Sequence, residues 1–285
     1  MAVMTQTHAA LAEDVGNIMS LEHVNVTQPD PLKATVFYIV GLGFTRDPYM
    51  TVGINNMWVN VGNSQFHLPT REPQALRGHT GLVVRDLSAL KERLASVEQQ
   101  LEGTKFSWSD KGDYVEATCP WGNVYHLYGP GRFGSMTLGM PYIEFTVPRG
   151  TADGITRFYQ QVFEAPARVE DGAAVVDIGS GQQLIFRETD APLPEYDGHH
   201  IAVYVTNFSG PMRWLEDRGL VSEGIRNHQF RFQEIVDPED GKPLFTIEHE
   251  VRSARHPFFH RTLVNREPEA PPMVIVSRTG VSQQQ

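Results

Sequence analysis

The chain has 285 residues, enough for two domains of ordinary size, and its formal net charge of −10 argues against a nucleic-acid-binding surface. Its single cysteine, Cys119, excludes an intrachain disulfide and a thiolate-rich zinc site, so any metal must be held by nitrogen and oxygen ligands. No apolar run is long enough to cross a bilayer and residues 1–20 lack the features of a signal peptide, so we expect a cytoplasmic protein without a membrane partner.

Apolar spacing in the first half predicts two units, each with one strand, one helix and then three strands, after a tail at 1–19. Gly41 and Gly43 are expected to end the first helix, and Gly62 to form a hairpin turn. The two units together predict a first domain at 20–131. The strands are expected at 21–26, 44–46, 54–61, 65–68, 79–84, 105–109, 113–118 and 124–128, and the helices at 32–40 and 88–101.

The same pattern recurs twice beyond a Gly-rich boundary at 131–140, which predicts a second domain at 140–252. Its strands are expected at 142–147, 167–170, 173–178, 182–187, 198–205, 229–235 and 244–251, and its helices near 154–163 and 211–218. A C-terminal tail at 253–285 could add an edge strand at 273–277.

A period of about fifty residues also fits a propeller or solenoid. One helix per repeat instead favours an α+β fold of four βαβββ units. We expect the first unit to pair with the second, and the third with the fourth, into two curved-sheet domains.

Four histidines occupy equivalent places in the first two units. His23 and His79 lie on the opening strands, and His67 and His126 follow them on the last strands by 44 and 47 residues. If the two units pack about a pseudo-twofold axis, these imidazoles converge on one point. Such a set suits one divalent transition metal (Fe, Zn, Ni or Co), and binding should weaken below roughly pH 6 as imidazoles titrate. Each histidine alone is equally typical of a hydrogen-bonded core residue.

Several stretches resemble the vicinal oxygen chelate superfamily, which includes glyoxalase I, extradiol dioxygenases and the bleomycin-resistance proteins. They are Leu21–Val26, Gln65–Leu68, Gly78–Leu87 and Trp121–Gly129, together with the repeats at 142–187 and 198–251. The resemblance implies metal ligands on first and last strands, here His23, His67, His79 and His126. Four units in one chain look most like the bacterial extradiol dioxygenases.

The second half offers Glu144, His200 and Glu248 at the matched places, as a second metal site or as a vestigial one in which Arg187 pairs with a carboxylate. His249 points away from Glu248 and is expected at the surface or beside the ligands. We could not assign a catalytic acid or base.

Three functions remain open from the sequence. The first is dioxygenase-type chemistry on a small bidentate substrate, such as an enol, catechol or hydroxy-ketone, at the four-histidine metal site. The second is an isomerase, epimerase or lyase acting through an enolate. The third is a non-catalytic ligand- or metal-binding protein of the resistance type. In each case the partner is a small molecule, and a homo-oligomer is possible.

Overall fold

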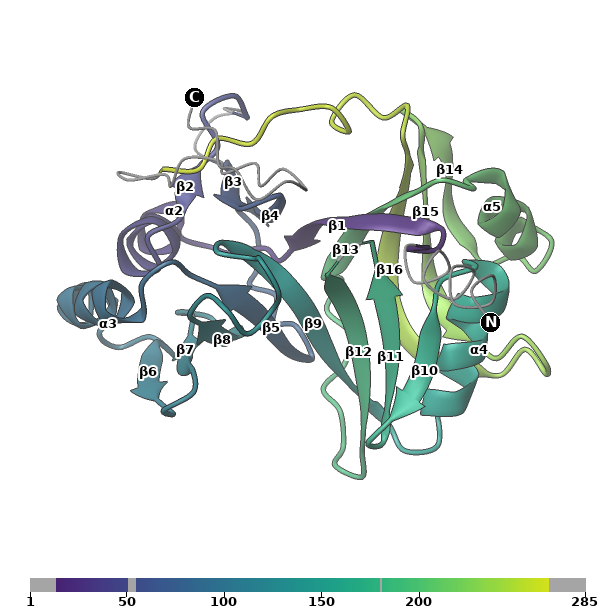
Figure 1. Ribbon diagram of the computed structural model, residues 1–285, viewed down its shortest axis with the longest axis horizontal. Coiled ribbons are helices and arrows are strands. Elements are labelled where there is room, and N and C mark those ends of the chain that lie inside the picture. Colours follow the sequence, from purple (N-terminus) through teal and green to yellow (C-terminus); the bar gives the residue numbers. More distant parts are fainter. Residues whose placement is uncertain (1–13, 51–54, 180, 267–285) are drawn as a thin grey trace, which may run out of the picture.

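The computed structural model describes residues 14–50, 55–179 and 181–266, which form two eight-stranded mixed sheets with helices packed against them (Figure 1). In spatial order, the first sheet contains β14 (Val221–Arg226), β15 (Gln229–Val236), β16 (Pro243–Ser253), β13 (His200–Val205), β1 (Ile18–Asn25), β4 (Ser64–Pro69), β3 (Asn56–Val61) and β2 (Thr45–Arg46). The second contains β10 (Ala167–Glu170), β11 (Ala173–Ile178), β12 (Gln182–Thr189), β9 (Gly139–Pro148), β5 (Gly78–Val83), β8 (Val124–Tyr128), β7 (Val115–Thr118) and β6 (Ser107–Asp110).

The helices fall where the apolar spacing predicts them. They are α2 (Pro31–Ala34), the π-helix η1 (Thr35–Gly41), α3 (Leu87–Ser96), the 3-10 helix η2 (Gln99–Leu101), α4 (Ala152–Val162) and α5 (Ser209–Glu216). Asp30 and Asp86 cap α2 and α3 by accepting hydrogen bonds from backbone N–H groups of the first turn. The first helix continues as a π-helix, a change that its apolar spacing does not reveal.

The predicted α+β fold of four βαβββ units in two sheets is confirmed. Strand β14 was not predicted, because its residues 222–226 are all exposed and carry no apolar alternation. The possible edge strand at 273–277 lies outside the described residues.

The predicted pairing of the units is wrong. The first sheet joins the first unit to the fourth, because β1 pairs antiparallel with β13. The second sheet joins the second unit to the third through β5 and β9. The short connection at 129–138 brings the third unit directly beside the second, which leaves the first and fourth units to pair with each other. The division at 131–140 therefore does not separate the two sheets.

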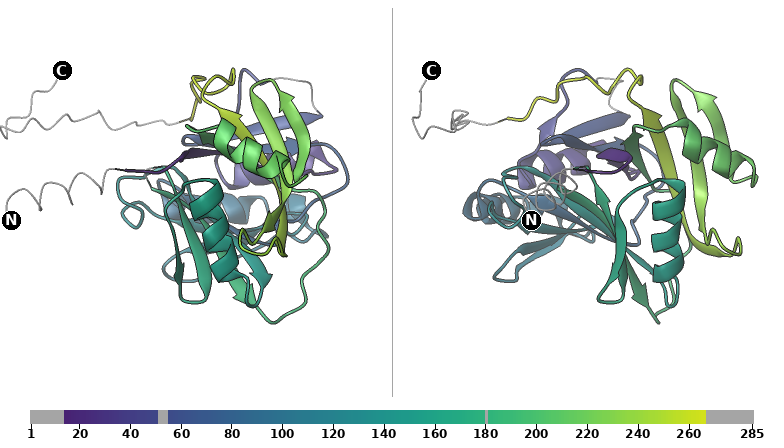
Figure 2. Two further views of the ribbon diagram at one scale, coloured as in Figure 1. Left: turned by 90° about the vertical axis from the view of Figure 1, so that its right-hand side faces the viewer. Right: turned by 45° about the vertical axis from the view of Figure 1, so that its right-hand side comes forward.

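The two sheets share one continuous hydrophobic core. Figure 2 shows α4 lying along strands of the second sheet, and the helix contacts β10 and β11 there as well as β15 of the first sheet. Its buried face includes Ile155, Phe158, Tyr159 and Val162, spaced as on one side of a helix. Within the described residues, no helix is long and apolar enough to cross a membrane.

The segment after β16 returns to the first unit, and Figure 1 shows it running from β16 towards β2 and β3. Asn265 forms two hydrogen bonds with the backbone of Gly62, at 2.8 and 3.0 Å. Arg261 forms an ion pair with buried Asp47 at 3.0 Å. These contacts hold the C-terminal segment (residues 254–266) against the edge of the first sheet.

Candidate metal centre

Three histidines meet at the centre of the first sheet. His23 lies on β1, His67 on β4 and His200 on β13, and each offers a ring nitrogen within 4.8 Å of the others. His23 and His200 are buried and His67 is partly buried. The cluster forms because β1 is the central strand, hydrogen-bonded to β4 on one side and to β13 on the other.

The Nε2 atoms of His23 and His200 lie 3.4 Å apart. Each histidine has a carboxylate beside its other nitrogen: Glu22 contacts Nδ1 of His23, and Glu248 Oε1 lies 3.4 Å from Nδ1 of His200. A carboxylate favours the tautomer with a proton on Nδ1, so both Nε2 atoms remain acceptors. Two acceptors cannot bond each other, whereas a metal ion at about 2.0–2.1 Å from each would satisfy both.

A β-bulge places Glu22 beside His23. Neighbouring residues of a regular strand point to opposite faces, but the pairing of β1 with β13 shifts register between Leu21 and His23. Burial raises the pKa of Glu22, but His23 and Arg252 outweigh it and lower that pKa to about 2. Glu22 is therefore an ionised, buried acceptor for the His23 ring.

His67 is fixed by two contacts. Its ring stacks on Trp58 with centroids 3.9 Å apart, and its Nε2 lies 2.6 Å from Oδ1 of Asn56. Burial lowers the pKa of His67 to about 2, and the charges of Arg252 and Arg231 add to that effect. Burial likewise holds the pKa of His200 well below its usual range, and the charges of Arg231 and Arg252 lower it further. Both rings are neutral at physiological pH, the form that binds a metal.

Glu250 is a fourth candidate ligand that the sequence analysis missed. Its Oε2 lies 3.8 Å from Nε2 of His200, and its side chain is 3% exposed. Arg231 and Arg252 both donate hydrogen bonds to it. Burial raises the pKa of Glu250, but the neighbouring positive groups, Arg252 and Arg231 among them, outweigh that effect and lower the pKa. The carboxylate is therefore ionised at the edge of the cluster.

Strand register supports Glu250 as the counterpart of His67. On β4, the direct partner of His23 is Gln65, and His67 lies two residues further along. On β16, the direct partner of His200 is Glu248, and Glu250 lies two residues further along. The predicted ligand Glu248 corresponds to Gln65 and instead contacts the outer nitrogen of His200. The prediction of Glu248 in place of Glu250 is thus wrong by two residues. Both side chains lie on the same face of the strand, so alternation alone could not distinguish them.

The structure does not bring the four predicted histidines together. His79 on β5 and His126 on β8 lie in the second sheet, where their rings are 3.8 Å apart. His79 Nε2 lies 3.1 Å from the hydroxyl of Tyr142, and His126 Nε2 lies 3.3 Å from Glu116. Burial lowers the pKa of His79 to about 4, with His126 adding to it. They lie together because β5 and β8 are neighbouring strands, and they lie apart from His23 and His67 because their unit joins the third unit.

The second predicted set is divided in the same way. His200 and Glu248 belong to the first sheet, but Glu144 lies on β9 of the second, opposite His79. Arg187 donates to Glu144 at 2.9 Å, as in the vestigial alternative. Register places Tyr142 where the first sheet has His200, and Ile185 where it has Glu250. Within the described residues, the second sheet therefore lacks the ligand set of the first.

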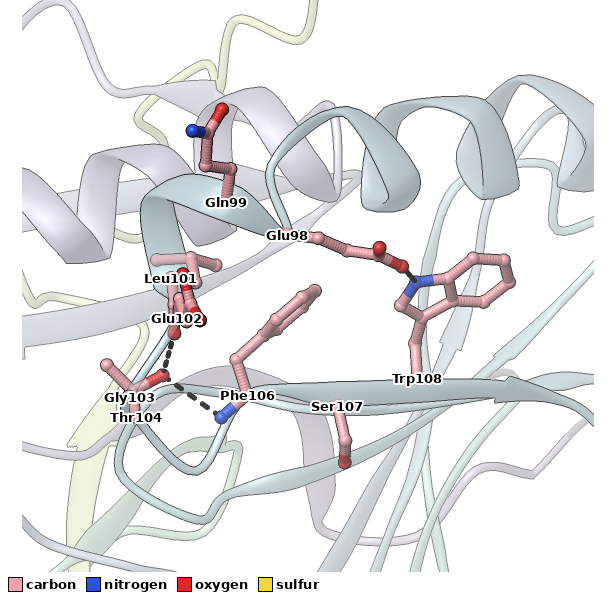
Figure 3. Close-up of a pocket in the computed structure, with 9 residues that line it drawn as sticks. All are labelled: Glu98, Gln99, Leu101, Glu102, Gly103, Thr104, Phe106, Ser107 and Trp108. Atoms are coloured by element: carbon pink, nitrogen blue, oxygen red, sulfur yellow. Dashed lines mark hydrogen bonds between the residues drawn. The ribbon is translucent and has the colours of Figure 1, made fainter.

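One cavity adjoins the three histidines, and a second, larger one does not. One of about 330 Å³ lies between β1 and the C-terminal segment and is lined by Glu22, Tyr204, Phe258 and Arg261, so it adjoins the three histidines through Glu22. Another of about 590 Å³ lies at the end of α3, where Glu98 accepts a hydrogen bond from Trp108 at 2.8 Å (Figure 3). None of the three histidines lines this second cavity.

No family model and no curated protein matches the sequence. The structure is similar to that of a putative dioxygenase from Bacillus subtilis subsp. subtilis str. 168, with 14% identity, a TM-score of 0.54 and coverage of 87% of this chain and 92% of that one. It is also similar to glyoxalase I from Zea mays, with 13% identity, a TM-score of 0.53 and coverage of 81% and 92%. At these identities the likeness establishes the fold.

Proposed function

We propose that this chain, which has the fold of the vicinal oxygen chelate superfamily, is a metal-dependent enzyme. In this proposal His23, His67, His200 and Glu250 hold one divalent transition metal. The observation that carries it is the 3.4 Å approach of two imidazole nitrogens whose other nitrogens face carboxylates. Three nitrogens and one carboxylate oxygen suit Fe, Zn, Ni or Co, and suit Mg or Ca poorly.

The surrounding side chains hold this ligand set in place. Glu22 keeps the proton of His23 on Nδ1, and Trp58 stacked on His67 sets the orientation of that ring. Arg231 and Arg252 balance the charge of Glu250 while it is buried. Such support limits the rearrangement that metal binding requires.

The substrate that fits such a centre is a small molecule with two adjacent oxygens, such as an enol, catechol or hydroxy-ketone. Four protein ligands leave two positions of an octahedron, enough for one bidentate molecule. A metal bound here would act as a Lewis acid and, if it is iron, would also permit reaction with O₂. Phe258, whose ring lies 6.2 Å from that of Trp58, would help to exclude water from the same side.

Dioxygenase-type chemistry is the leading reaction in this proposal. An isomerase, epimerase or lyase needs a base that moves a proton, and Glu250 is the carboxylate best placed for it. However, the net lowering of its pKa by the neighbouring positive groups, Arg252 and Arg231 among them, makes it a weak base. The enolate route is therefore the second candidate, and it becomes the first if Glu250 leaves its arginines when substrate binds.

The metal is tested by elemental analysis of protein isolated without a polyhistidine tag. We expect close to one divalent transition metal per chain in the wild type, loss of that metal in His200→Ala, and retention in the matched control His126→Ala. Loss in His126→Ala with retention in His200→Ala would refute the assignment.

The reaction is tested by oxygen uptake of the Fe(II)-loaded protein with a panel of catechols and hydroxy-ketones. Uptake that disappears in His200→Ala supports the dioxygenase. Proton exchange with solvent at the substrate carbon, without oxygen uptake, favours the enolate route. Binding of the panel without either reaction would support a non-catalytic ligand-binding protein.

A further inference from the structure

A cavity of about 390 Å³ lies where the first unit, the second unit and the C-terminal segment meet. Three arginines line it, Arg85, Arg93 and Arg266, together with Thr45, Asn60 and Asn265. None of these residues belongs to the histidine cluster. Among the lining residues that the structure describes, Asp86 is the one carboxylate, so the cavity is predominantly cationic although the formal net charge of the chain is −10.

Arg93 comes from α3, and its guanidinium lies flat against Gly43. A Cβ atom at Gly43 would be 2.8 Å from the Cζ and Nε atoms of Arg93, and the positive φ of 76° also favours glycine there. The buried Nε of Arg93 has no hydrogen-bond partner within the described residues. A partly buried donor without a partner is costly, which indicates that something outside these residues satisfies it.

Arg266 approaches the same cavity from the C-terminal segment. Its backbone N–H donates to Oγ1 of Thr45 at 2.7 Å, and its guanidinium donates to the carbonyl oxygen of Phe44 at 2.7 Å. In the described part of the chain, no carboxylate forms an ion pair with Arg93 or Arg266. The hydrogen-bond acceptors beside Arg266 are thus backbone carbonyl groups, while the carboxylate of Asp86 lines the same cavity without forming an ion pair with either arginine.

Arg93 and Arg266 repel each other, and Asp86 offsets that repulsion from within the chain. Burial lowers the pKa of Arg93, Asp86 acts in the opposite direction, and the charge of Arg266 has a smaller lowering effect. Asp86 Oδ1 is already engaged with the backbone N–H groups of Ser88 and Ala89 at 2.8 and 3.0 Å. A bound anion would remove the repulsion between the arginines and would supply the acceptor that Arg93 lacks.

We propose that this cavity is a binding site for a small oxyanion, a phosphate or carboxylate group held between Arg93 and Arg266. Guanidinium groups bind both groups through paired hydrogen bonds, and the volume suits a small metabolite. Arg85 adds a third positive charge to the rim. The site would couple the C-terminal segment to the second unit, since each contributes one of the two arginines.

Titration calorimetry with inorganic phosphate, and separately with malonate at the same ionic strength, tests the site. We expect one of the two probes to bind stoichiometrically, and at least tenfold more weakly to Arg93→Gln and to Arg266→Gln. Preference for phosphate or for malonate identifies the source of the oxyanion. The matched control is Arg213→Gln, which removes one positive charge from an exposed position on α5.

Two further measurements keep the test decisive if a variant folds poorly. Arg93→Lys keeps the charge without the planar fork, and we expect an intermediate affinity. The metal content of each variant should equal that of the wild type when the fold is intact and the proposed metal centre exists. Absence of binding to both probes, or equal binding by wild type, Arg93→Gln and Arg213→Gln, would overturn the proposal.

Discussion

The Nε2 atom of His23 faces the Nε2 atom of His200 across 3.4 Å, although 177 positions separate the two residues in the chain. One residue comes from the first unit and the other from the fourth. The candidate metal centre is therefore a product of the pairing between the first and fourth units.

Glu250 should contribute more to metal affinity than Glu248. Both carboxylates bond Arg231, so either substitution by glutamine removes one negative charge from the same group. We expect Glu250→Gln to lose the metal on dialysis, because in the proposed centre it removes a direct ligand. Glu248→Gln should weaken binding by about 10-fold, as is typical for a residue behind a ligand histidine. Equal affinities of the two variants, measured by competition with a chelator, would argue against Glu250 as a ligand.

Metal binding should persist well below pH 6, contrary to the expectation from the ordinary imidazole pKa. A proton competes with the metal for each ring, and burial lowers the pKa of His67 to about 2 and that of His200 well below 6.5. Both rings then remain unprotonated at pH 5. Equilibrium dialysis between pH 7.5 and 4.5 should show retained metal at pH 5, with circular dichroism as the check on folding. A midpoint of metal loss near pH 6 would contradict this prediction.

His249 should make the protein less stable in acid. The ring is fully buried, where its Nδ1 donates to the carbonyl of Ile247 and its Nε2 accepts from the hydroxyl of Tyr159. Burial lowers its pKa to about 4, whereas an unfolded histidine titrates near 6.5. The unfolded state therefore binds the proton first as pH falls. The contribution of neutral His249 to the free energy of unfolding is therefore complete above about pH 6.5. It is lost as pH falls through 4, and the loss amounts to about 3 kcal/mol.

Urea unfolding at several pH values measures this effect. His249→Gln keeps an acceptor for Tyr159 but cannot titrate, so its free energy of unfolding should change less between pH 6.5 and 4 than that of the wild type. His260→Gln, at an exposed position, is the matched control and should follow the wild type. A His249→Gln curve parallel to the wild-type curve would show that the ring does not carry the effect.

Gly81→Ala should destabilise the second sheet. A Cβ atom at Gly81 would lie 2.2 Å from the Cε1 atom of Tyr142, whose ring covers the backbone of β5. Overpacking of this kind costs about 1–3 kcal/mol. Gly224→Ala on β14 is the matched control, because a Cβ atom there meets nothing within 4 Å. Thermal unfolding of the two variants gives the comparison, and equal midpoints would mean that Tyr142 moves aside at little cost.

The sequence was sufficient for the elements and insufficient for their pairing. Alternation and glycine placement located the four units, and His23, His67 and His200 were each identified as possible ligands. The partner of each unit could not be deduced, because His23 and His67 on one side and His79 and His126 on the other have nearly the same spacing. An isolated strand pattern specifies which face is buried, and it does not specify which of three similar edges completes the sheet.

Two contributors to the site depended on geometry that single-residue patterns do not contain. Glu22 reaches His23 only because a bulge turns both side chains to one side. Glu250 required the register of β13 against β16, in which Ala202 is its direct partner. His249 was expected at the surface or beside the ligands, and it is a core residue stacked on Phe232 with ring centroids 4.4 Å apart. The prediction that His249 and Glu248 point to opposite faces of the strand is correct. The prediction that His249 lies at the surface or beside the ligands is wrong, because its face packs into the core.

The partnership of β1 with β13 has a consequence for biosynthesis. While the ribosome is still translating, the inner units can complete their sheet as soon as β12 emerges, whereas β1, paired with β4 on one side, must leave its other edge unpaired until residue 205 has been made. An open strand edge of that kind invites pairing with a neighbouring nascent chain. The earliest-made part of this polypeptide therefore matures last, and its vulnerability to aggregation is set by the speed with which the final unit is delivered.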